Sequence, residues 1–257
     1  MKFHPPNKKL VDDAADLVVS ACKESFGSSL EYVTLKGSAV KGDFVPGYSD
    51  FDFHVFLGPE AMESERVPKI GCALRFQKAF GRVKPADYGV SQFQIYFINS
   101  QRYPADWVPP AEGTFRVVWG ELPSAVTEAD NQLYIQQANK NLKTADDTRR
   151  SLIGRFVDKP DAAIPGLVRL LGTFLKGYMY SVMILLLTEN PKDGIKLRLD
   201  EMITQVEKGI GSKGHFAVYF DQISDWAVIQ QNADKVRAAF EEGMEALEEI
   251  GRWYNSR

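Results

Sequence analysis

The chain has few of the residues that hold disulfide-rich domains or metal clusters together. Its 257 residues include two cysteines, Cys22 and Cys72, and three histidines. The cysteines lie far apart in the chain and have no partners at metal-ligand spacing, so we expect two reduced thiols. This pattern excludes a disulfide-rich extracellular scaffold and indicates a cytoplasmic protein.

Long apolar runs and an excess of one charge are also lacking. The N-terminal segment 1–18 has lysines but no apolar run behind them, which excludes a signal peptide and a membrane anchor. The longest apolar run, residues 179–188, is too short to span a bilayer. We therefore expect no membrane partner. The formal net charge of −3 gives no basic field, which argues against a nucleic-acid partner and favours a small-molecule substrate.

In the first half of the chain, some apolar residues follow helical spacing and others follow the spacing of strands. A hydrophobic fraction of 44% with 25% charged residues provides enough apolar side chain for a sizeable core. Spacing and turn residues predict helices near 9–24 and 65–80, and strands at 30–35, 51–57, 92–98 and 115–119. Residues 1–122 are thus predicted to form an α+β domain.

The second half shows helical spacing almost throughout. Helices are predicted near 126–157, 165–189, 197–208 and 225–254, with proline and glycine breakers between them. Such a pattern is typical of an all-α helical bundle, so residues 123–257 are predicted to form a second domain. The sequence leaves open whether the chain forms a homodimer.

The segment 36–56, KGSAVKGDFVPGYSDFDFHVF, is the one most suggestive of chemistry. On a strand, Asp50, Asp52 and His54 share one face, and the intervening apolar residues share the other. Two neighbouring carboxylates repel each other unless a cation neutralises them. Mg²⁺ suits this need, because it takes one or two carboxylates and completes its shell with water and phosphate oxygens.

Gly37 and Ser38 follow directly on the strand predicted at 30–35. Glycine lets the backbone approach a phosphate, and a serine hydroxyl near backbone N–H groups can hold phosphate oxygens. The residues between Ser38 and Asp50 are enough to return the chain antiparallel and to place the acids beside the Gly-Ser turn. This segment therefore predicts a site for a triphosphate and a metal, flanked by Lys36 and Lys41.

This order of strand, Gly-Ser, a loop, then Asp50-Phe51-Asp52-Phe53 resembles the signature of the DNA polymerase beta-like nucleotidyltransferase superfamily. A small catalytic domain followed by helices looks like the aminoglycoside adenylyltransferases and related minimal nucleotidyltransferases. The resemblance implies a nucleotidyltransferase-fold mixed sheet with helices, followed by the bundle. It also implies Mg²⁺-dependent transfer of a nucleoside monophosphate, AMP from ATP or another nucleoside triphosphate, to a hydroxyl of a small-molecule acceptor such as an aminoglycoside, with release of pyrophosphate.

The resemblance also assigns roles to residues of the site. Asp50 and Asp52 would be catalytic and bind the metal, and Gly37 and Ser38 would bind the nucleotide. In the aminoglycoside enzymes a lysine near a turn between helices reaches the nucleotide, and Lys192 and Lys196 match it loosely. Alternatively, both lysines are solvated surface residues that do not contact the nucleotide.

Catalytic members of this superfamily carry a third carboxylate on a later strand. The corresponding strand here reads SQFQIYFI and carries no acid. Gln92, Gln94 and Tyr96 share its polar face, which we expect to look toward Asp50 and Asp52. An amide cannot accept the proton of an acceptor hydroxyl. Asp87, Glu112 or Glu121 could substitute, and Glu121 is the predicted catalytic residue because it follows a strand expected to neighbour this one.

Other interpretations stay open. The two acids could be a solvated structural pair. A metal-dependent glycosyltransferase would explain Asp50 and Asp52, but not Gly37 and Ser38. The chain could also be a catalytically weak or inactive protein of this fold that binds nucleotide or a partner, as a regulator or antitoxin component does. His54 fits a packed histidine better than a third metal ligand.

Overall fold

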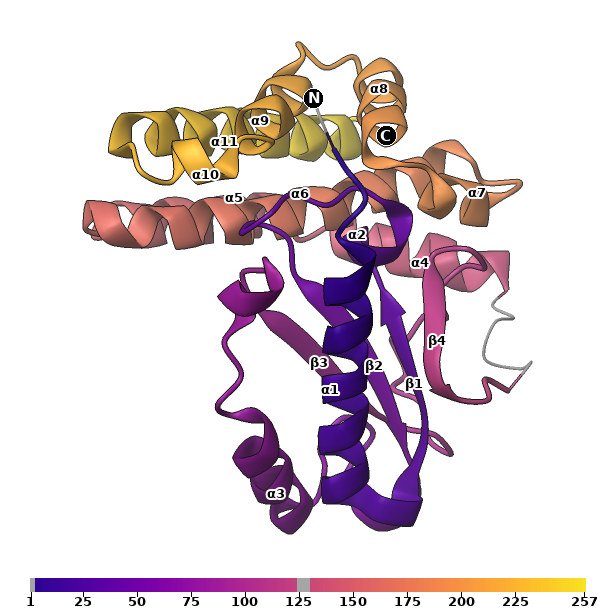
Figure 1. Cartoon of the computed structure of the whole chain (residues 1–257). Coiled ribbons are helices and arrows are strands. Elements are labelled where there is room, and N and C mark those ends of the chain that lie inside the picture. The colour runs from indigo at the N-terminus through magenta and orange to yellow at the C-terminus, as the bar shows by residue number, and fades with distance from the viewer. Residues whose placement is uncertain (1–2, 124–129) are drawn as a thin grey trace. The chain divides into compact units, whose positions relative to one another are not determined.

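The computed structural model describes residues 3–123 and 130–257 (Figure 1). The chain divides into two compact units, His4–Glu128 and Ala129–Arg257 with Met1–Phe3. The described residues form one four-stranded mixed sheet and eleven α-helices, which confirms the predicted α+β class. No helix among these residues is long and apolar enough to cross a membrane.

The unit His4–Glu128 contains all four strands. Its sequence alternates helices and strands in an order close to that expected from the hydrophobic pattern. The elements are α1 (Lys8–Phe26), β1 (Leu30–Lys36), α2 (Ser38–Lys41), β2 (Phe51–Leu57), α3 (Ile70–Phe80), β3 (Phe93–Asn99) and β4 (Phe115–Gly120), with short 3₁₀ turns at Gly27–Ser29, Pro59–Ala61 and Pro85–Tyr88.

The strands follow the order β3-β2-β1-β4 across the sheet. β1 is antiparallel to both β2 and β4, whereas β2 and β3 are parallel. A parallel pair needs a crossover connection, and the segment between β2 and β3 that contains α3 supplies it. The predicted antiparallel return from the Gly-Ser turn is therefore confirmed.

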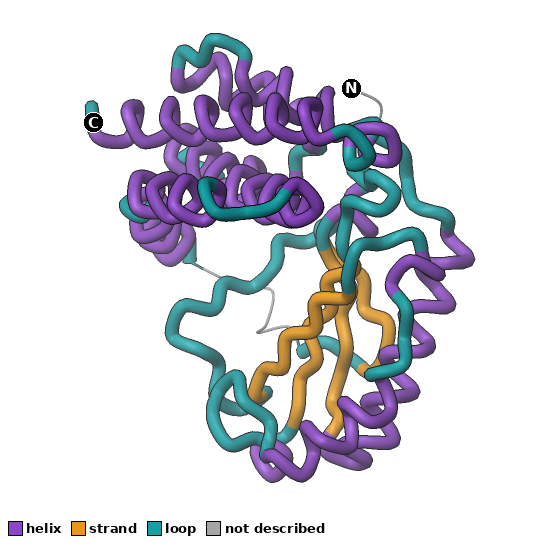
Figure 2. The backbone as a smooth tube through the Cα atoms, turned by 90° about the vertical axis from the view of Figure 1, so that its left-hand side faces the viewer, coloured by secondary structure: helices purple, strands orange, loops and turns teal. Residues whose placement is uncertain are grey.

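The sheet buries one face much more completely than the other. Phe51, Phe53 and Val55 of β2 are fully buried and belong to a core with residues of α1 and α3. Figure 2 shows these helices along one side of the sheet and loops along the other. On the loop side, a smaller cluster of Tyr32, Phe56 and Ile98 packs against Tyr103 and Trp107. Alternation places Asp52 and His54 on this less covered side.

The helical unit has no strand among the described residues from 130 to 257. Its central helix is α6 (Ile164–Leu186), which is buried along most of its length and packs against most of the other helices. The remaining elements are α4 (Asn131–Leu142), α5 (Ala145–Phe156), α7 (Pro191–Lys196), α8 (Leu199–Ile210), α9 (His215–Ile223), α10 (Trp226–Ile229) and α11 (Ala233–Asn255), with a 3₁₀ turn at Asp161–Ala163.

Several predicted helix boundaries are wrong. The helix predicted at 65–80 begins only at Ile70, because Pro68 disfavours helical conformation in the residue before it and removes a backbone donor. The helix predicted at 126–157 is two helices, and its first residues lie outside the described ranges. The break falls at Thr144, whose hydroxyl donates to the Asn141 carbonyl and contacts the Tyr178 hydroxyl.

The sequence pattern also missed several short helices, namely α2, α7 and α9. α9 was not anticipated, although Phe216, Tyr219, Phe220 and Ile223 follow helical spacing and are all buried. Its nine residues are rich in aromatic and β-branched side chains, which also suit a strand. The predicted helix at 225–254 is divided at Asn232, which caps α11 by accepting from the backbone N–H groups of Asp234 and Lys235.

Candidate functional site

The Gly37-Ser38 turn forms where β1 ends and the short helix α2 begins. Gly37 has φ +77°, a conformation that residues with a Cβ rarely adopt. Its carbonyl accepts from the backbone N–H groups of Val40 and Lys41, both at 3.0 Å. A Cβ at position 37 would lie 2.6 Å from Oδ2 of Asp52. The backbone therefore favours glycine here, and any larger residue would have to displace the Asp52 carboxylate.

Strand pairing brings the two acids to the same edge of the sheet as this turn. Asp52 lies opposite Lys36 in the antiparallel register of β1 and β2. Asp50 immediately precedes β2. Gly37, Ser38, Asp50 and Asp52 are thus brought together, as the sequence predicted, by the hydrogen-bonded pairing of two strands.

Asp50 is held by side chains that come from β3 and the residues just before it. Oδ1 of Asp50 accepts from the Ser91 hydroxyl, and Oδ2 accepts from the amides of Gln92 (3.1 Å) and Gln94 (2.5 Å). The Tyr96 hydroxyl donates to the other end of the Gln94 amide. The expectation that the polar face of this strand looks toward the acids is therefore confirmed.

The parallel register places an amide on the strand where the resemblance implies a third carboxylate. Gln94 of β3 lies directly opposite Asp52 of β2. Its amide nitrogen binds Asp50 and its amide oxygen accepts from Tyr96, so the amide orients the carboxylate and does not add charge. Ser91 was not identified from the sequence. Its only signal was its place one residue ahead of the predicted strand.

Glu121 is not brought to this edge. The prediction that its strand neighbours β3 is wrong, because β2 and β1 lie between β3 and β4. In the register of β4 on β1, Phe115 lies opposite Lys36 and Gly120 opposite Tyr32. Glu121 therefore follows the end of β4 that lies opposite Tyr32, away from the edge at Lys36.

The other two candidate acids differ in position from Glu121. Glu112 precedes β4 by three residues, so it lies on the side of the sheet edge where Phe115 meets Lys36. Asp87 lies in the 3₁₀ turn Pro85–Tyr88 ahead of β3, which starts beside Phe51. Both side chains are exposed. In the strand register, Glu112 and Asp87 therefore lie nearer to this edge than Glu121 does.

Lys36 and His54 set the electrostatics of the less covered face. Burial lowers the pKa of the Lys36 ammonium, and the Asp52 carboxylate offsets part of this effect. Lys36 Nζ lies 5.3 Å from the centre of the Tyr96 ring. His54 is buried, packs edge-on against Tyr96, and has a pKa well below its usual value because of burial and then of the charges of Lys36 and Arg66. It is thus a neutral, packed histidine at neutral pH.

The donor set at this edge fits a hard divalent cation that binds through few protein ligands. The described residues contain no group of three or more histidine, cysteine or acidic side chains that could hold a metal ion. Mg²⁺ does not require such a group, since it binds through one or two carboxylates, water and phosphate oxygens. Asp50 and Asp52 are the residues that would hold it.

Lys192 and Lys196 lie in α7 of the helical unit. Lys196 pairs with Asp193, with 3.6 Å between ammonium and carboxylate, and Lys192 Nζ lies 5.9 Å from the centre of the Tyr134 ring. Both contacts are made within the helical unit. Their predicted nucleotide contact therefore stays a prediction.

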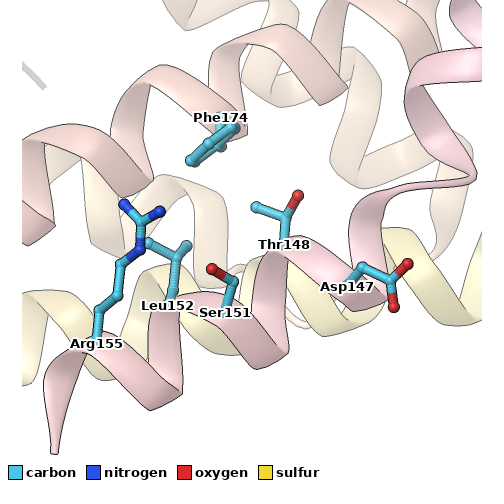
Figure 3. Close-up of a pocket in the computed structure, with 6 residues that line it drawn as sticks. All are labelled: Asp147, Thr148, Ser151, Leu152, Arg155 and Phe174. Atoms are coloured by element: carbon cyan, nitrogen blue, oxygen red, sulfur yellow. The ribbon is translucent and has the colours of Figure 1, made fainter.

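A shallow pocket also lies within the helical unit, between α5 and α6 (Figure 3). Its volume is about 230 Å³, and the Phe174 ring faces the polar side of α5 across it. The hydroxyl of Thr148, which lines it, is engaged with Tyr178 at 2.7 Å. The lining residues are Asp147, Thr148, Ser151, Leu152, Arg155 and Phe174.

Comparisons with known proteins do not add a family to this description. No protein-family model matches the chain, and no curated protein matches it either. The geometry of the sheet edge therefore carries the inference of function.

Proposed function

We propose that the unit His4–Glu128 is a nucleotidyltransferase-like unit that binds a nucleoside triphosphate with Mg²⁺ at the edge formed by Gly37, Ser38, Asp50 and Asp52. The observation that carries this proposal is the close approach of Gly37 to Asp52, since a Cβ would lie 2.6 Å from its carboxylate. At this turn the backbone of a glycine lies beside a carboxylate. The backbone can approach phosphate oxygens while the carboxylate binds a metal ion, so the turn suits a triphosphate with a bound metal.

The reaction proposed is transfer of a nucleoside monophosphate to a hydroxyl of a small acceptor. The acceptor oxygen forms a bond to the α-phosphorus, the bond from that phosphorus to the bridging oxygen of the β-phosphate breaks, and pyrophosphate leaves. Mg²⁺ supplies charge neutralisation for the phosphates when it is bound. The chain contributes the positions of Asp50 and Asp52, and the α2 backbone and Ser38 orient the triphosphate.

The proton of the acceptor hydroxyl needs a base. Gln94 cannot take it, because a neutral amide does not accept a proton at neutral pH. Glu112 and Asp87 are the acids that the topology brings toward this edge, so one of them is the proposed acceptor of the proton. Only the sequence resemblance supports ATP as the nucleotide and an aminoglycoside as the acceptor.

A second candidate function is nucleotide binding without turnover. The neutral side chains that donate to Asp50, the Gln94 amide opposite Asp52 among them, favour it, because they add no negative charge where the resemblance implies a third carboxylate. A protein of this kind would act through its nucleotide-bound state as a regulator or as a component of an antitoxin system.

One pair of measurements separates the two functions. Calorimetry measures binding of MgATP, and a pyrophosphate assay with a panel of hydroxylated acceptors, aminoglycosides included, measures transfer. Asp52→Asn should abolish both signals and leave the fold intact, whereas Asp13→Asn, at an exposed acid of α1, should change neither. MgATP binding that Asp52→Asn removes, without pyrophosphate from any acceptor, supports the second function. Full activity of Asp52→Asn would disprove the assignment of the site.

A further inference from the structure

Helix α3 and its flanks form a charged surface that the net charge of the chain does not suggest. The segment 66–86 contains six cationic residues and no acid. All six side chains are exposed. They are Arg66, Lys69, Arg75, Lys78, Arg82 and Lys84.

The same surface exposes aliphatic side chains in a row. Ile70 and Leu74 lie one turn apart on α3 and are 71% and 61% exposed, and Val67, just before the helix, is 51% exposed. The opposite side of α3 is the one that packs into the unit, with Phe76 buried against Phe26 of α1. Figure 1 shows α3 beside the C-terminal part of α1. We name Val67, Ile70 and Leu74 the aliphatic ridge.

Few of the cations are neutralised within the chain. Arg66 pairs with Asp106 at 2.6 Å, and Arg75 donates to the Ser25 carbonyl at 3.0 Å. Among the residues that the structure describes, the side chains of Lys78, Arg82 and Lys84 form no ion pair or hydrogen bond. Lys78 lies one turn after Leu74 on α3, and Arg82 and Lys84 follow the C-terminal end of the helix. This surface therefore carries cations whose charge is available to an external anion.

We propose that α3 and its flanks dock on the surface of a bilayer that contains anionic phospholipids. A helix with exposed aliphatic residues bordered by Lys and Arg lies in the membrane interface, with its apolar residues at the boundary between headgroups and acyl chains. The cations are attracted to the lipid phosphates. Such peripheral contact needs no spanning helix, and it is independent of the function proposed for the sheet edge.

The surface suits other occupants less well. The aliphatic ridge has no aromatic ring on which a nucleic-acid base could stack, and it would separate the cations from a phosphate backbone. The six exposed cations and the aliphatic ridge amount to nine side chains, far fewer than the 20 to 30 residues per side of a typical stable protein interface. A second copy that docked through the same surface would bring two cationic clusters together.

Vesicle sedimentation of the full chain tests the proposal. The probes are vesicles of phosphatidylcholine alone and of phosphatidylcholine with about a third phosphatidylglycerol, at low and at high salt. Binding is expected only with phosphatidylglycerol and only at low salt. Lys78→Gln with Arg82→Gln should lower the partition coefficient about 30-fold, since each cation near an anionic surface contributes about fivefold. Ile70→Ser with Leu74→Ser should lower it about tenfold or more.

Lys208→Gln with Lys235→Gln is the matched control, because both lysines are exposed in the helical unit. This variant should bind within about twofold of the wild type, and circular dichroism should show every variant folded. Equal binding to pure phosphatidylcholine, no binding at all, or equal losses in the control would overturn the proposal. Two further results would also overturn it: single-stranded RNA bound in place of vesicles and lost in Lys78→Gln with Arg82→Gln, or a dimer that Ile70→Ser with Leu74→Ser abolishes.

Discussion

Gly37 and Asp52 lie so close together that a Cβ on the glycine would be 2.6 Å from the carboxylate oxygen. Gly27 has a similar backbone conformation, with φ +56° and ψ −127° against φ +77° and ψ −151° for Gly37. No atom outside its immediate neighbours lies within 4 Å of the place where a Cβ on Gly27 would be. Alanine variants at the two positions therefore distinguish the effect of backbone strain from the effect of displacing the Asp52 carboxylate.

Gly37→Ala and Gly27→Ala should each lower the free energy of unfolding, by about 1 to 3 kcal/mol, because both place a Cβ in a strained backbone region. Only Gly37→Ala should also weaken binding of MgATP, because its methyl group pushes the Asp52 carboxylate away. Urea unfolding and calorimetric titration measure the two effects. Equal loss of MgATP binding in both variants would contradict a special role for the Gly37–Asp52 approach.

Gln94→Glu should make the stability of the unit depend on Mg²⁺. The Gln94 amide donates to Asp50 at 2.5 Å, so a glutamate would put a like charge beside two carboxylates. Without divalent cations we expect a loss of about 1 to 3 kcal/mol in the free energy of unfolding, recovered when Mg²⁺ is added. Thermal unfolding with and without Mg²⁺ measures this difference.

Gln92→Glu is the comparison for that variant. Gln92 also donates to Asp50, at 3.1 Å, but its side chain is exposed and the repulsion would be screened by solvent and salt. Gln92→Glu should therefore lower the free energy of unfolding less than Gln94→Glu does. If the stability of Gln94→Glu does not depend on Mg²⁺, the result would argue against a cation site at this edge.

Glu112, Asp87 and Glu121 should differ in their effect on the transfer reaction. If a proton acceptor completes the site, alanine at Glu112 or at Asp87, but not at both, should lower kcat about a hundredfold or more. Glu121→Ala should leave kcat unchanged, because Glu121 follows the end of β4 that lies opposite Tyr32. Steady-state kinetics of the three variants decide the question. A large effect of Glu121→Ala alone would disprove the argument from strand register.

His54 should make the folded state less stable in mild acid. Its pKa in the folded state lies well below the usual value of 6.5, chiefly because of burial, so the unfolded chain binds a proton that the folded chain does not. The free energy of unfolding should therefore fall as pH drops below about 6.5, by at most about 1.4 kcal/mol per pH unit from this group. In His54→Phe this contribution should be absent. Urea unfolding at pH 7, 6 and 5 compares the slopes, and the same slope in both proteins would contradict the assignment.

The sequence by itself determined the local features of the site. Alternation along β2 is a property of any extended strand, so Asp52 and His54 had to share one side while Phe51, Phe53 and Val55 faced the other. The same reasoning placed Gln92, Gln94 and Tyr96 on one face of β3. The glycine at position 37 permits the positive φ found there but does not determine it, since Gly58 and Gly81 have negative φ.

Tertiary structure alone decided which of these local features meet. Strand order depends on hydrogen bonds between residues far apart in the chain, so no local pattern showed that β4 pairs with β1 and not with β3. Because of that pairing, Glu121 follows the end of β4 that is far from Asp50 and Asp52, whereas Glu112 precedes the end that lies opposite Lys36. The contacts of Ser91 and Gln94 with Asp50 likewise arise only because β2 and β3 run parallel in one register, a relationship set by packing and not by spacing along the chain.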